Sequence, residues 1–462
     1  MKQIVNRFIK KHSLLCKGAT VVVGVSGGPD SIALLHYLVV NQSLWRINVI
    51  AVAVDHGLRG KESEEDLLFV KKYCEHISVP FIGKKVDVQN YKKIHRVSTQ
   101  VAARNCRYDC FKEVIEQYDA KFLALAHHGD DQIETMLMRQ VRGAHGYGLA
   151  GIKVKRPFYS ATLIRPFLTV NKADIEQYCK EYHLDYRIDQ SNFQEGYVRN
   201  RFRAHILPFL KKENPKVHER FQQQSELRYE DEAFLVELAK KELESVIVSK
   251  NEQKVIICND TYNRLPIPLQ RRGFQLILNY LYNETPPEIS TFHMDEFISL
   301  LKRKLPSGSL HFPKGLYIQK SYNKCLISYE EKLGNNEFEH RLVVPGIVTL
   351  EKGKIIAKLF HTKPDIALTK NVCLCDAKGL TGDSLIVRTR KRGDRMTVFG
   401  MQGTKKLKDI FIDAKVEQDE RDSWPIITTS EDTIIWIPGI KRSNVCLISE
   451  ETKRFLLIQY IQ

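Results

Sequence analysis

The sequence lacks several patterns that would fix its class at once. None of its 10 cysteines forms a C-x-x-C pair, so the usual spacing of zinc ribbons and iron–sulfur sites is missing. No apolar run reaches membrane-spanning length, and the basic start MKQIVNRFIKKHSLL has no long apolar core of the kind found in signal peptides. We therefore expect a cytoplasmic protein with reduced cysteines and no membrane partner.

Acidic residues are in deficit. The chain has 71 Lys and Arg against 55 Asp and Glu, a net charge of +16 over 462 residues. Such a balance favours a polyanionic partner, because binding releases condensed counterions. A solvated basic surface accounts for the charge equally well, so charge alone does not decide between the two.

The first part of the chain alternates strand-like and helix-like segments. Strands are predicted over 19–25, 49–54, 81–88, 122–126 and 163–168, and helices over 31–40, 63–76, 98–118, 130–141 and 171–182. This alternation predicts βαβ units and a Rossmann-like α/β fold with a parallel sheet. Ligands of such sheets lie at the carboxyl ends of the strands.

The later parts of the chain change character twice. Long helical patterns cover 217–248, 268–282 and 290–301, and short β-branched strands follow from about residue 310. We therefore predict four parts: an α/β nucleotide-binding domain over 1–212, a small helical domain over 213–310, a β-rich connecting segment over 311–384 and a C-terminal α+β domain over 385–462.

The strongest motif is VGVSGGPDS, residues 23–31, between the first predicted strand and helix. Unpaired N–H groups at a helix start attract anions, and glycines let the backbone approach phosphates. The motif is neither G-x-x-x-x-G-K-[ST] nor G-x-G-x-x-G. Ser26 and Ser31 can add hydroxyl donors. An acid inside a phosphate loop is unusual for an ordinary glycine turn, so Asp30 is predicted to hold magnesium.

A second cluster, AHHGDDQIET at residues 126–135, ends a strand and opens a helix. Asp131 and Glu134 are three apart and share a helix face. They can hold a cationic substrate or take up a proton from an amine, and His127 can contact phosphate or transfer a proton. An acidic first turn that offsets the helix dipole explains one acid but not the whole set. Arg104 and Arg107 share another helix face, which suits phosphates or surface ion pairs.

The motif S-G-G-x-D-S resembles the PP-loop of ATP pyrophosphatases, which cleave ATP between its α- and β-phosphates. Further segments look like tRNA(Ile)-lysidine synthetases, and with the motif they extend the resemblance over nearly the whole chain. They are DHGLR 55–59, AAR 102–104, HHGDDQIET 127–135, RGAHGYGLAG 142–151, IRPFL 164–168, DQSN 189–192, RNRFR 199–203, RTRKRGD 388–394 and KKLKD 405–409.

This resemblance implies a concrete reaction. ATP adenylates the C2 oxygen of the wobble cytidine in tRNA(Ile) with a CAU anticodon. The ε-amine of free L-lysine then attacks C2, AMP leaves and lysidine forms, so that the codon read changes from AUG to AUA. The cofactors implied are ATP and Mg²⁺, the partners are that tRNA and lysine, and the family also suggests a homodimer.

The resemblance assigns roles residue by residue. The nucleotide phosphates and magnesium fall to Ser26, Gly27, Gly28, Pro29, Asp30 and Ser31. Asp55 and His56 are expected beside the adenosine. Arg104 and His127 are expected to stabilise charge during adenylyl transfer, and Asp131 and Glu134 to bind the lysine ammonium. The residues expected to contact tRNA are basic: Arg199, Arg201, Arg203, Arg388, Arg390, Lys391, Arg392, Lys405, Lys406 and Lys408.

Two other functions remain open at this point. Another PP-loop tRNA enzyme, such as a 2-thiolation enzyme, would need reactive sulfur, and Cys106 and Cys110 can face each other on a helix. A non-catalytic tRNA-binding protein would keep the basic surface without turnover. For the basic run in the C-terminal domain, the alternative is a solvated charged loop.

Overall fold

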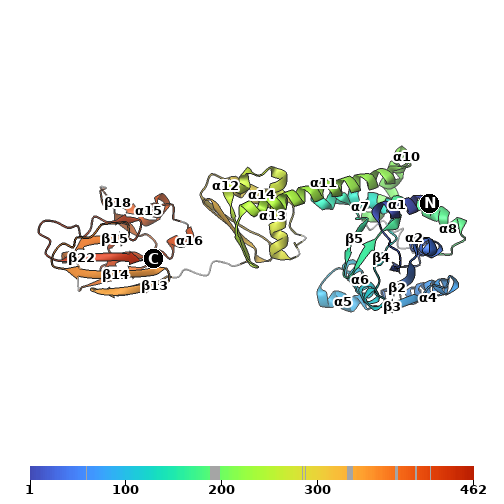
Figure 1. Cartoon of the computed structure of the whole chain (residues 1–462), viewed down its shortest axis with the longest axis horizontal. Helices are drawn as coiled ribbons and strands as arrows, with labels where there is room; N and C mark the ends of the chain where they lie inside the picture. The colour runs from blue at the N-terminus through green and yellow to red at the C-terminus, as the bar shows by residue number, and fades with distance from the viewer. Residues whose placement is uncertain are drawn as a thin grey trace. The chain divides into compact units, whose positions relative to one another are not determined.

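A computed structural model describes the chain except residues 59, 188–197, 284, 287, 330–336, 380–382, 401–402, 417 and 462, and the side chains of residues 61, 418 and 419. The chain divides into two compact units, Met1–Glu237 and Leu238–Gln462, and each is described by itself (Figure 1). Among the described residues no helix is long and apolar enough to cross a membrane.

The first unit contains a six-stranded sheet in the order β3-β2-β1-β4-β6-β5. The strands are β1 Thr20–Gly24, β2 Asn48–Asp55, β3 Phe81–Lys85, β4 Phe122–Ala124, β5 Lys155–Phe158 and β6 Ala161–Ile164. All neighbours pair in parallel except β5, which runs antiparallel to β6 at the edge. The predicted parallel α/β sheet is thus confirmed, and the edge strand β5 is an addition to it.

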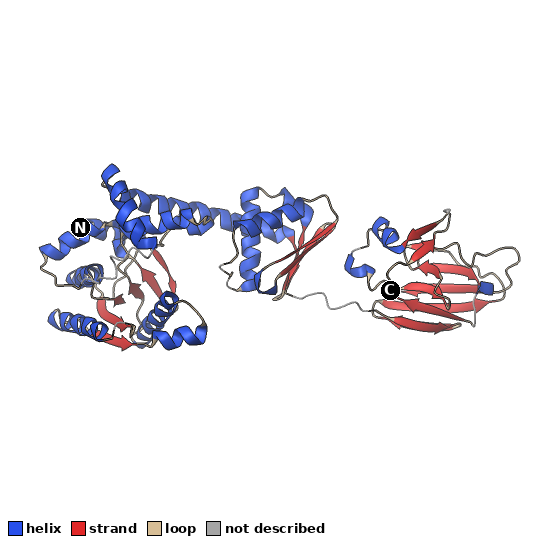
Figure 2. Ribbon diagram, turned by 180° about the vertical axis from the view of Figure 1, so that it is seen from behind, coloured by secondary structure: helices blue, strands red, loops and turns tan. Residues whose placement is uncertain are grey.

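Helices cover both faces of this sheet (Figure 2). One face packs against α1 Lys2–His12, α2 Pro29–Val40, α4 Lys61–His76 and α8 Lys172–Glu181, and the other against α6 Thr99–Gln117. The β1 strand shows why: Val21 and Val23 enter the first core and Val22 the second, because strand side chains alternate. Helix α1 was not predicted.

Several helices follow the sheet or connect its strands. They are α3 Gln42–Trp45, α5 Val88–His95, α7 Gly129–Val141, α9 Val198–Arg201, α10 Leu207–Glu213 and α11 Val217–Val246, with short turns η1 Gly146–Ala150, η2 Pro166–Thr169 and η4 Phe202–Ile206. The predicted strand over 81–88 was too long, because the Asp87 side chain caps α5 by accepting from Asn90 N at 2.9 Å.

The second unit begins with helices packed on a five-stranded antiparallel sheet, β7-β8-β11-β10-β9 (Figure 2). Its elements are α12 Asn259–Arg264, α13 Ile267–Tyr282, α14 Thr291–Lys302, β7 Ile247–Lys250, β8 Lys254–Cys258, β9 Ser307–His311, β10 Tyr317–Ser321 and β11 Lys324–Ser328. Since β8 pairs with β11, the predicted boundary at residue 310 cuts through one sheet. Helices α11, α13 and α14 were predicted, whereas α12, β7 and β8 were missed.

The last part is rich in strands: it contains two larger sheets, β12-β16-β19-β20-β21 and β13-β14-β22-β15, and the two-stranded sheet β17-β18. Residues of both sheets share one core, as Val387 and Ile458 do. The elements are β12 Glu339–Val343, β13 Gly346–Leu350, β14 Gly353–Phe360, β15 Val372–Asp376, β16 Ser384–Arg388, β17 Arg395–Thr397, β18 Thr404–Lys406, α15 Leu407–Asp413, α16 Gln418–Arg421, β19 Ile426–Thr429, β20 Ile434–Ile437, β21 Lys441–Arg442 and β22 Phe455–Ile461. Helix α15 begins directly after β18, at Leu407.

The glycine-rich stretch after α7 is held by a buried amide. Gln132 is fully buried, and its Oε1 accepts from Ile152 N at 2.6 Å while its Nε2 donates to Ile152 O at 3.1 Å. Gly151, with φ of 75°, lies so close that an added Cβ would stand 2.5 Å from Gln132 Oε1. Glycine is therefore required at this position by both backbone and space.

We predict that Gly151→Ala destabilises the protein by about 2–4 kcal/mol, because left-handed strain and overpacking add together. Gly143→Ala is the matched control: Gly143 has φ of 72° but nothing within 4 Å of an added Cβ. It should cost only about 1 kcal/mol of strain. Urea unfolding of both variants measures the difference, and equal losses would show that the contact with Gln132 is not limiting.

Candidate active site

The glycine loop joins β1 to α2 and is shaped by one serine. Ser31 is buried, its Oγ accepts from Ser26 N at 3.1 Å, and it donates to Gly28 O at 2.9 Å. Gly27 has φ of 83°, a backbone state that favours glycine. Pro29 occupies the first turn of α2, where a missing N–H costs nothing. These features leave the loop folded around the start of α2, as a phosphate-binding loop requires.

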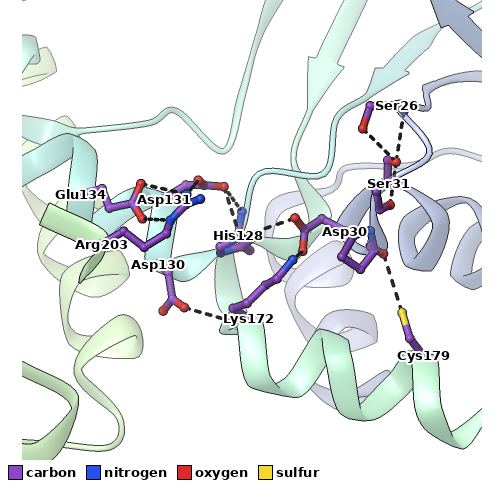
Figure 3. Close-up of polar contacts among 12 residues, drawn as sticks. Ser26, Asp30, Ser31, His128, Asp130, Asp131, Glu134, Lys172, Cys179 and Arg203 are labelled. Carbon is purple, nitrogen blue, oxygen red and sulfur yellow. Dashed lines mark hydrogen bonds and ion pairs between the residues drawn. The ribbon is translucent and has the colours of Figure 1, made fainter. Parts of the chain in front are cut away.

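Asp30, the predicted magnesium ligand, is engaged by a lysine (Figure 3). Its Oδ1 accepts from Lys172 Nζ at 2.6 Å, and its Oδ2 lies 3.9 Å from His128 Nε2. The Asp30 side chain keeps 31% of its surface exposed, so its oxygens remain reachable. Sequence reasoning missed Lys172. The available signal was a lysine in the first turn of α8, where the helix dipole disfavours a cation.

Helices α7 and α8 begin beside each other and are fixed by Asp130. This carboxylate is buried, and its Oδ2 accepts from Lys211 Nζ at 2.6 Å and from Lys172 N at 3.2 Å. Gly129 N donates to Val170 O at 2.7 Å, which closes the junction. Asp130 therefore positions the site and presents no group to a substrate.

Asp131 and Glu134 lie together, as their spacing predicted, but two arginines cover them, of which Figure 3 shows Arg203. Glu134 has 1% of its side chain exposed and accepts from Arg199 Nε at 2.7 Å and from Arg203 Nε at 2.8 Å. Asp131 Oδ1 accepts from Arg199 Nη2 at 3.1 Å. Burial opposes ionisation of Asp131, but His128 and Arg199 outweigh it and hold the pKa of its carboxyl below its usual value.

The expected roles of the 199–203 arginines must therefore be revised in part. Arg199 and Arg203 are partners of the acidic pair, with two-fifths of each side chain exposed, whereas Arg201 lies exposed on the surface. Contact with tRNA stays a prediction for all three. Two nearby sequence calls, Asp189 to Asn192 and Arg59, lie outside the described residues.

Two adjacent histidines link the halves of the site. His128 caps α7, is 4% exposed, and its Nε2 lies 3.6 Å from Asp131 Oδ2 as well as near Asp30. Burial lowers the pKa of His127 to about 3, so this imidazole is neutral near pH 7. His127 can therefore donate or accept a hydrogen bond, but it does not supply a positive charge.

The remaining predicted residues of the first unit lie at strand ends or on α6. Asp55 ends β2, is buried, and accepts from Gly57 N at 2.8 Å, which shapes the turn in which His56 lies. Arg104 is exposed, stacks over the Tyr108 ring at 4.6 Å and donates to its hydroxyl at 3.0 Å. Burial raises the pKa of Cys106 and of Cys110, the latter to about 11, which does not favour a reactive sulfur carrier.

Four of the basic residues expected on the C-terminal RNA surface have acidic partners. Arg388 is 1% exposed and binds Asp394 at 2.9 Å and Asp432 at 2.6 Å. Its expected contact with RNA is wrong for this structure, because the guanidinium is part of the core. Arg390 pairs with Asp422, Lys391 with Glu339 and Asp432, and Lys405 with Asp413. Arg392, Lys406 and Lys408 are exposed and keep their prediction.

The chain resembles known proteins over nearly its whole length. Residues 1–210 match the family described as "PP-loop domain", and residues 385–457 match the "TilS substrate C-terminal domain" family. A tRNA(Ile)-lysidine synthase of Geobacillus kaustophilus is 44% identical over 456 residues, 99% of this chain and 98% of the relative. Another tRNA(Ile)-lysidine synthase, of Bacillus subtilis, is 46% identical over 445 residues, 95% and 93% of the two chains.

The glycine loop, the acidic head of α2 and these matches define the first unit as a PP-loop domain. Sequence identity above two-fifths over almost the full length identifies the family within this class. The chain belongs to the tRNA(Ile)-lysidine synthase family, which confirms the family predicted from the sequence.

We predict that His127 stays neutral down to about pH 4, because burial holds its pKa at about 3. Its ordinary value of 6.5 applies in the unfolded chain, which therefore binds more protons between those two pH values. Its contribution to stability is complete above pH 6.5 and is lost as the pH falls toward 3, by up to about 1.4 kcal/mol per pH unit.

Imidazole NMR of the folded protein, with His127→Gln to assign the signal, measures this directly. The exposed His76→Gln variant serves as the control for the effect of removing a histidine. A His127 signal that titrates near pH 6.5 would contradict the prediction, as would an acid stability profile that His127→Gln leaves unchanged.

We predict that Arg388→Met lowers the free energy of unfolding by about 3 kcal/mol, because Asp394 and Asp432 then lose a buried counter-charge. Arg390→Met breaks only a partly exposed pair with Asp422 and should cost about 1 kcal/mol or less. Denaturant titration of the two variants compares them. A larger loss of stability for Arg390→Met than for Arg388→Met would contradict the structural role assigned to Arg388.

Proposed function

We propose that this protein joins free L-lysine to C2 of the wobble cytidine of tRNA(Ile) with a CAU anticodon, at the expense of ATP. Two relatives of nearly equal length carry the name tRNA(Ile)-lysidine synthase, which supports the substrate pair. The observation that carries the proposal is the position of His128, 3.9 Å from Asp30 and 3.6 Å from Asp131. One side chain thus lies between the nucleotide loop and the acidic pair.

The residues around the loop suit a nucleoside triphosphate with magnesium. Ser26, Gly27 and Gly28 would hold the phosphates through backbone N–H groups at the start of α2. Asp30 would hold magnesium, since its carboxylate is partly exposed and hard oxygen ligands suit this ion. An ion held there would supply positive charge next to the phosphates. Asp55 and His56, at the end of β2, would face the adenosine.

The reaction has two balanced halves. The cytidine O2 attacks the α-phosphorus of ATP, and the bond to pyrophosphate breaks. The lysine Nε then bonds to C2, the C2–O bond breaks with departure of AMP, and the amine loses its proton. A base must take that proton, because the ordinary pKa of a lysine amine, about 10.4, lies far above neutrality.

The arginine partners bear on the state in which the amine arrives. Asp131 and Glu134 alone would stabilise an ammonium and so oppose its deprotonation. Arg199 and Arg203 already cancel those two negative charges. A neutral amine can then accept or donate hydrogen bonds at the pair without an extra buried charge, which favours the nucleophilic form.

The defining experiment incubates the protein with ATP, magnesium, labelled lysine and candidate tRNAs. Label should enter only isoleucine tRNA with a CAU anticodon, and pyrophosphate exchange should require that tRNA. Tight tRNA binding without exchange would instead support a non-catalytic binding protein. Sulfur transfer to the same tRNA would support a thiolation enzyme, although the raised thiol pKa values of Cys106 and Cys110 speak against it.

We predict that Glu134→Gln raises the KM for lysine by roughly tenfold, equivalent to about 1.4 kcal/mol, while tRNA-dependent pyrophosphate exchange is retained. The change leaves Arg199 and Arg203 with an uncompensated charge that repels a cationic substrate. Asp130→Asn is the control, since Asp130 binds Lys211 and the α8 backbone. Asp130→Asn should lower thermal stability without a selective change in the KM for lysine. If Asp130→Asn raised this KM and Glu134→Gln did not, Glu134 would be excluded from lysine binding.

A cytoplasmic location and a homodimeric state belong to the same proposal. Light scattering of the purified chain tests the dimer, and fractionation of cells tests the location.

A further inference from the structure

Three side chains lie along one face of α6 in the first unit. Arg104, Tyr108 and Lys112 are spaced four residues apart, so they follow one another along the helix over about 12 Å. The Arg104 guanidinium lies 4.6 Å from the centre of the Tyr108 ring. This face therefore alternates cation, ring and cation.

The edge hairpin of β5 and β6 supplies the neighbouring row. The Arg156 guanidinium lies 5.6 Å from the centre of the Tyr108 ring, and Lys112 Nζ lies 4.7 Å from the centre of the Tyr159 ring. Phe158 packs between the two elements, edge-on to Tyr108 at 5.3 Å. We call Arg104, Tyr108, Lys112, Arg156 and Tyr159 the cation–aromatic strip.

One end of the strip lies at the carboxyl edge of the sheet, the edge that also carries the candidate active site. Residue Ile164 ends β6 at the carboxyl edge of the sheet, and antiparallel pairing places Lys155 opposite it. Arg156 is therefore near that edge, and Tyr159, in the hairpin turn, is at the other end. Helix α6 runs the same way, since it follows β3 and starts at the carboxyl edge. The strip thus leads away from the site along the side of the sheet.

Of the three cations in the strip, only Lys112 has an acidic partner among the described residues. Among the described residues, neither Arg104 nor Arg156 forms an ion pair, and Lys112 approaches Glu116 only to 3.9 Å. Burial of Arg165, together with repulsion from Arg156 and Arg104, lowers the pKa of its guanidinium to about 10. Like charges held together without a counter-ion are relieved by an anionic ligand.

Tyr159 is also an unusual residue for its place. It occupies the two-residue turn between β5 and β6 with φ of 48°, where Asn or Gly is favoured. The residue keeps 59% of its surface exposed. A bulky ring kept on the surface at a strained backbone position indicates a role other than stability.

We propose that the cation–aromatic strip binds a single-stranded segment of the tRNA next to the target cytidine, with phosphates on the cations and a base stacked on Tyr159. This rests on the proposed function. Alternating cations and exposed rings are typical of surfaces that bind single-stranded nucleic acid. The triphosphate of ATP does not fit there, because the glycine loop follows β1 while the strip flanks β5, the far edge strand.

Tyr159→Asn and Lys112→Gln test the proposal in the full-length protein. Tyr159→Asn should weaken binding of tRNA roughly tenfold through loss of stacking, and because it suits the turn it should not lower the thermal midpoint. Lys112→Gln should reduce the slope of log Kd against log salt by about one phosphate contact. Neither should change the Kd for ATP with magnesium measured without tRNA.

Matched controls separate this surface from general charge and aromatic effects. Lys71 on α4 pairs with Glu75 at 3.9 Å and four residues apart, the same arrangement as Lys112 with Glu116, and Tyr118 is 39% exposed at the end of α6. Lys71→Gln and Tyr118→Ala should bind tRNA like the wild type. Strip variants that also do so would overturn the proposal, and so would weaker ATP binding. Wild-type tRNA binding and pyrophosphate exchange, measured alongside, report on the proposed function separately.

Discussion

A buried carboxylate must be paired, and in this protein that constraint organises the active site. Glu134 is almost wholly buried, and Arg199 and Arg203 donate to both of its oxygens, which offsets the cost of burying these polar atoms. These arginines come from the short helical segments α9 and η4 that follow the sheet. The pairing therefore fixes this later segment against α7, and the shape of the site depends on it.

The same principle repeats around the other acids. Asp30 has Lys172, Asp130 has Lys211, and Asp131 shares Arg199, so each acid at the heads of α2 and α7 has a basic partner from a later segment. Helix N-termini attract negative charge, which explains why the acids gather there. The basic residues that balance them lie 68 to 142 residues further along the chain, so the spacing within one motif does not reveal the pairs.

The sequence predicts features that depend on local patterns, and it does not predict contacts between residues far apart in the chain. The glycine loop, the acidic turn of α7 and the parallel sheet are local patterns of spacing and alternation, and all were predicted from the sequence. Lys172 and Lys211 were missed because their partners are distant in the chain. Strands β7 and β8 were missed because they are short, and because β8 pairs with β11 across intervening helices. Arg388 was misassigned because a basic run does not show which member is buried.

Arg199 and Arg203 also affect how strongly the active site attracts other cations in a cell. An uncompensated acidic pair would attract polyamines and other abundant cations as readily as an amino acid. Because Arg199 and Arg203 form ion pairs with Asp131 and Glu134, the site attracts such ions only weakly at long range. Discrimination between amines then depends on shape and hydrogen bonding at close range, and the site does not concentrate cations of every kind.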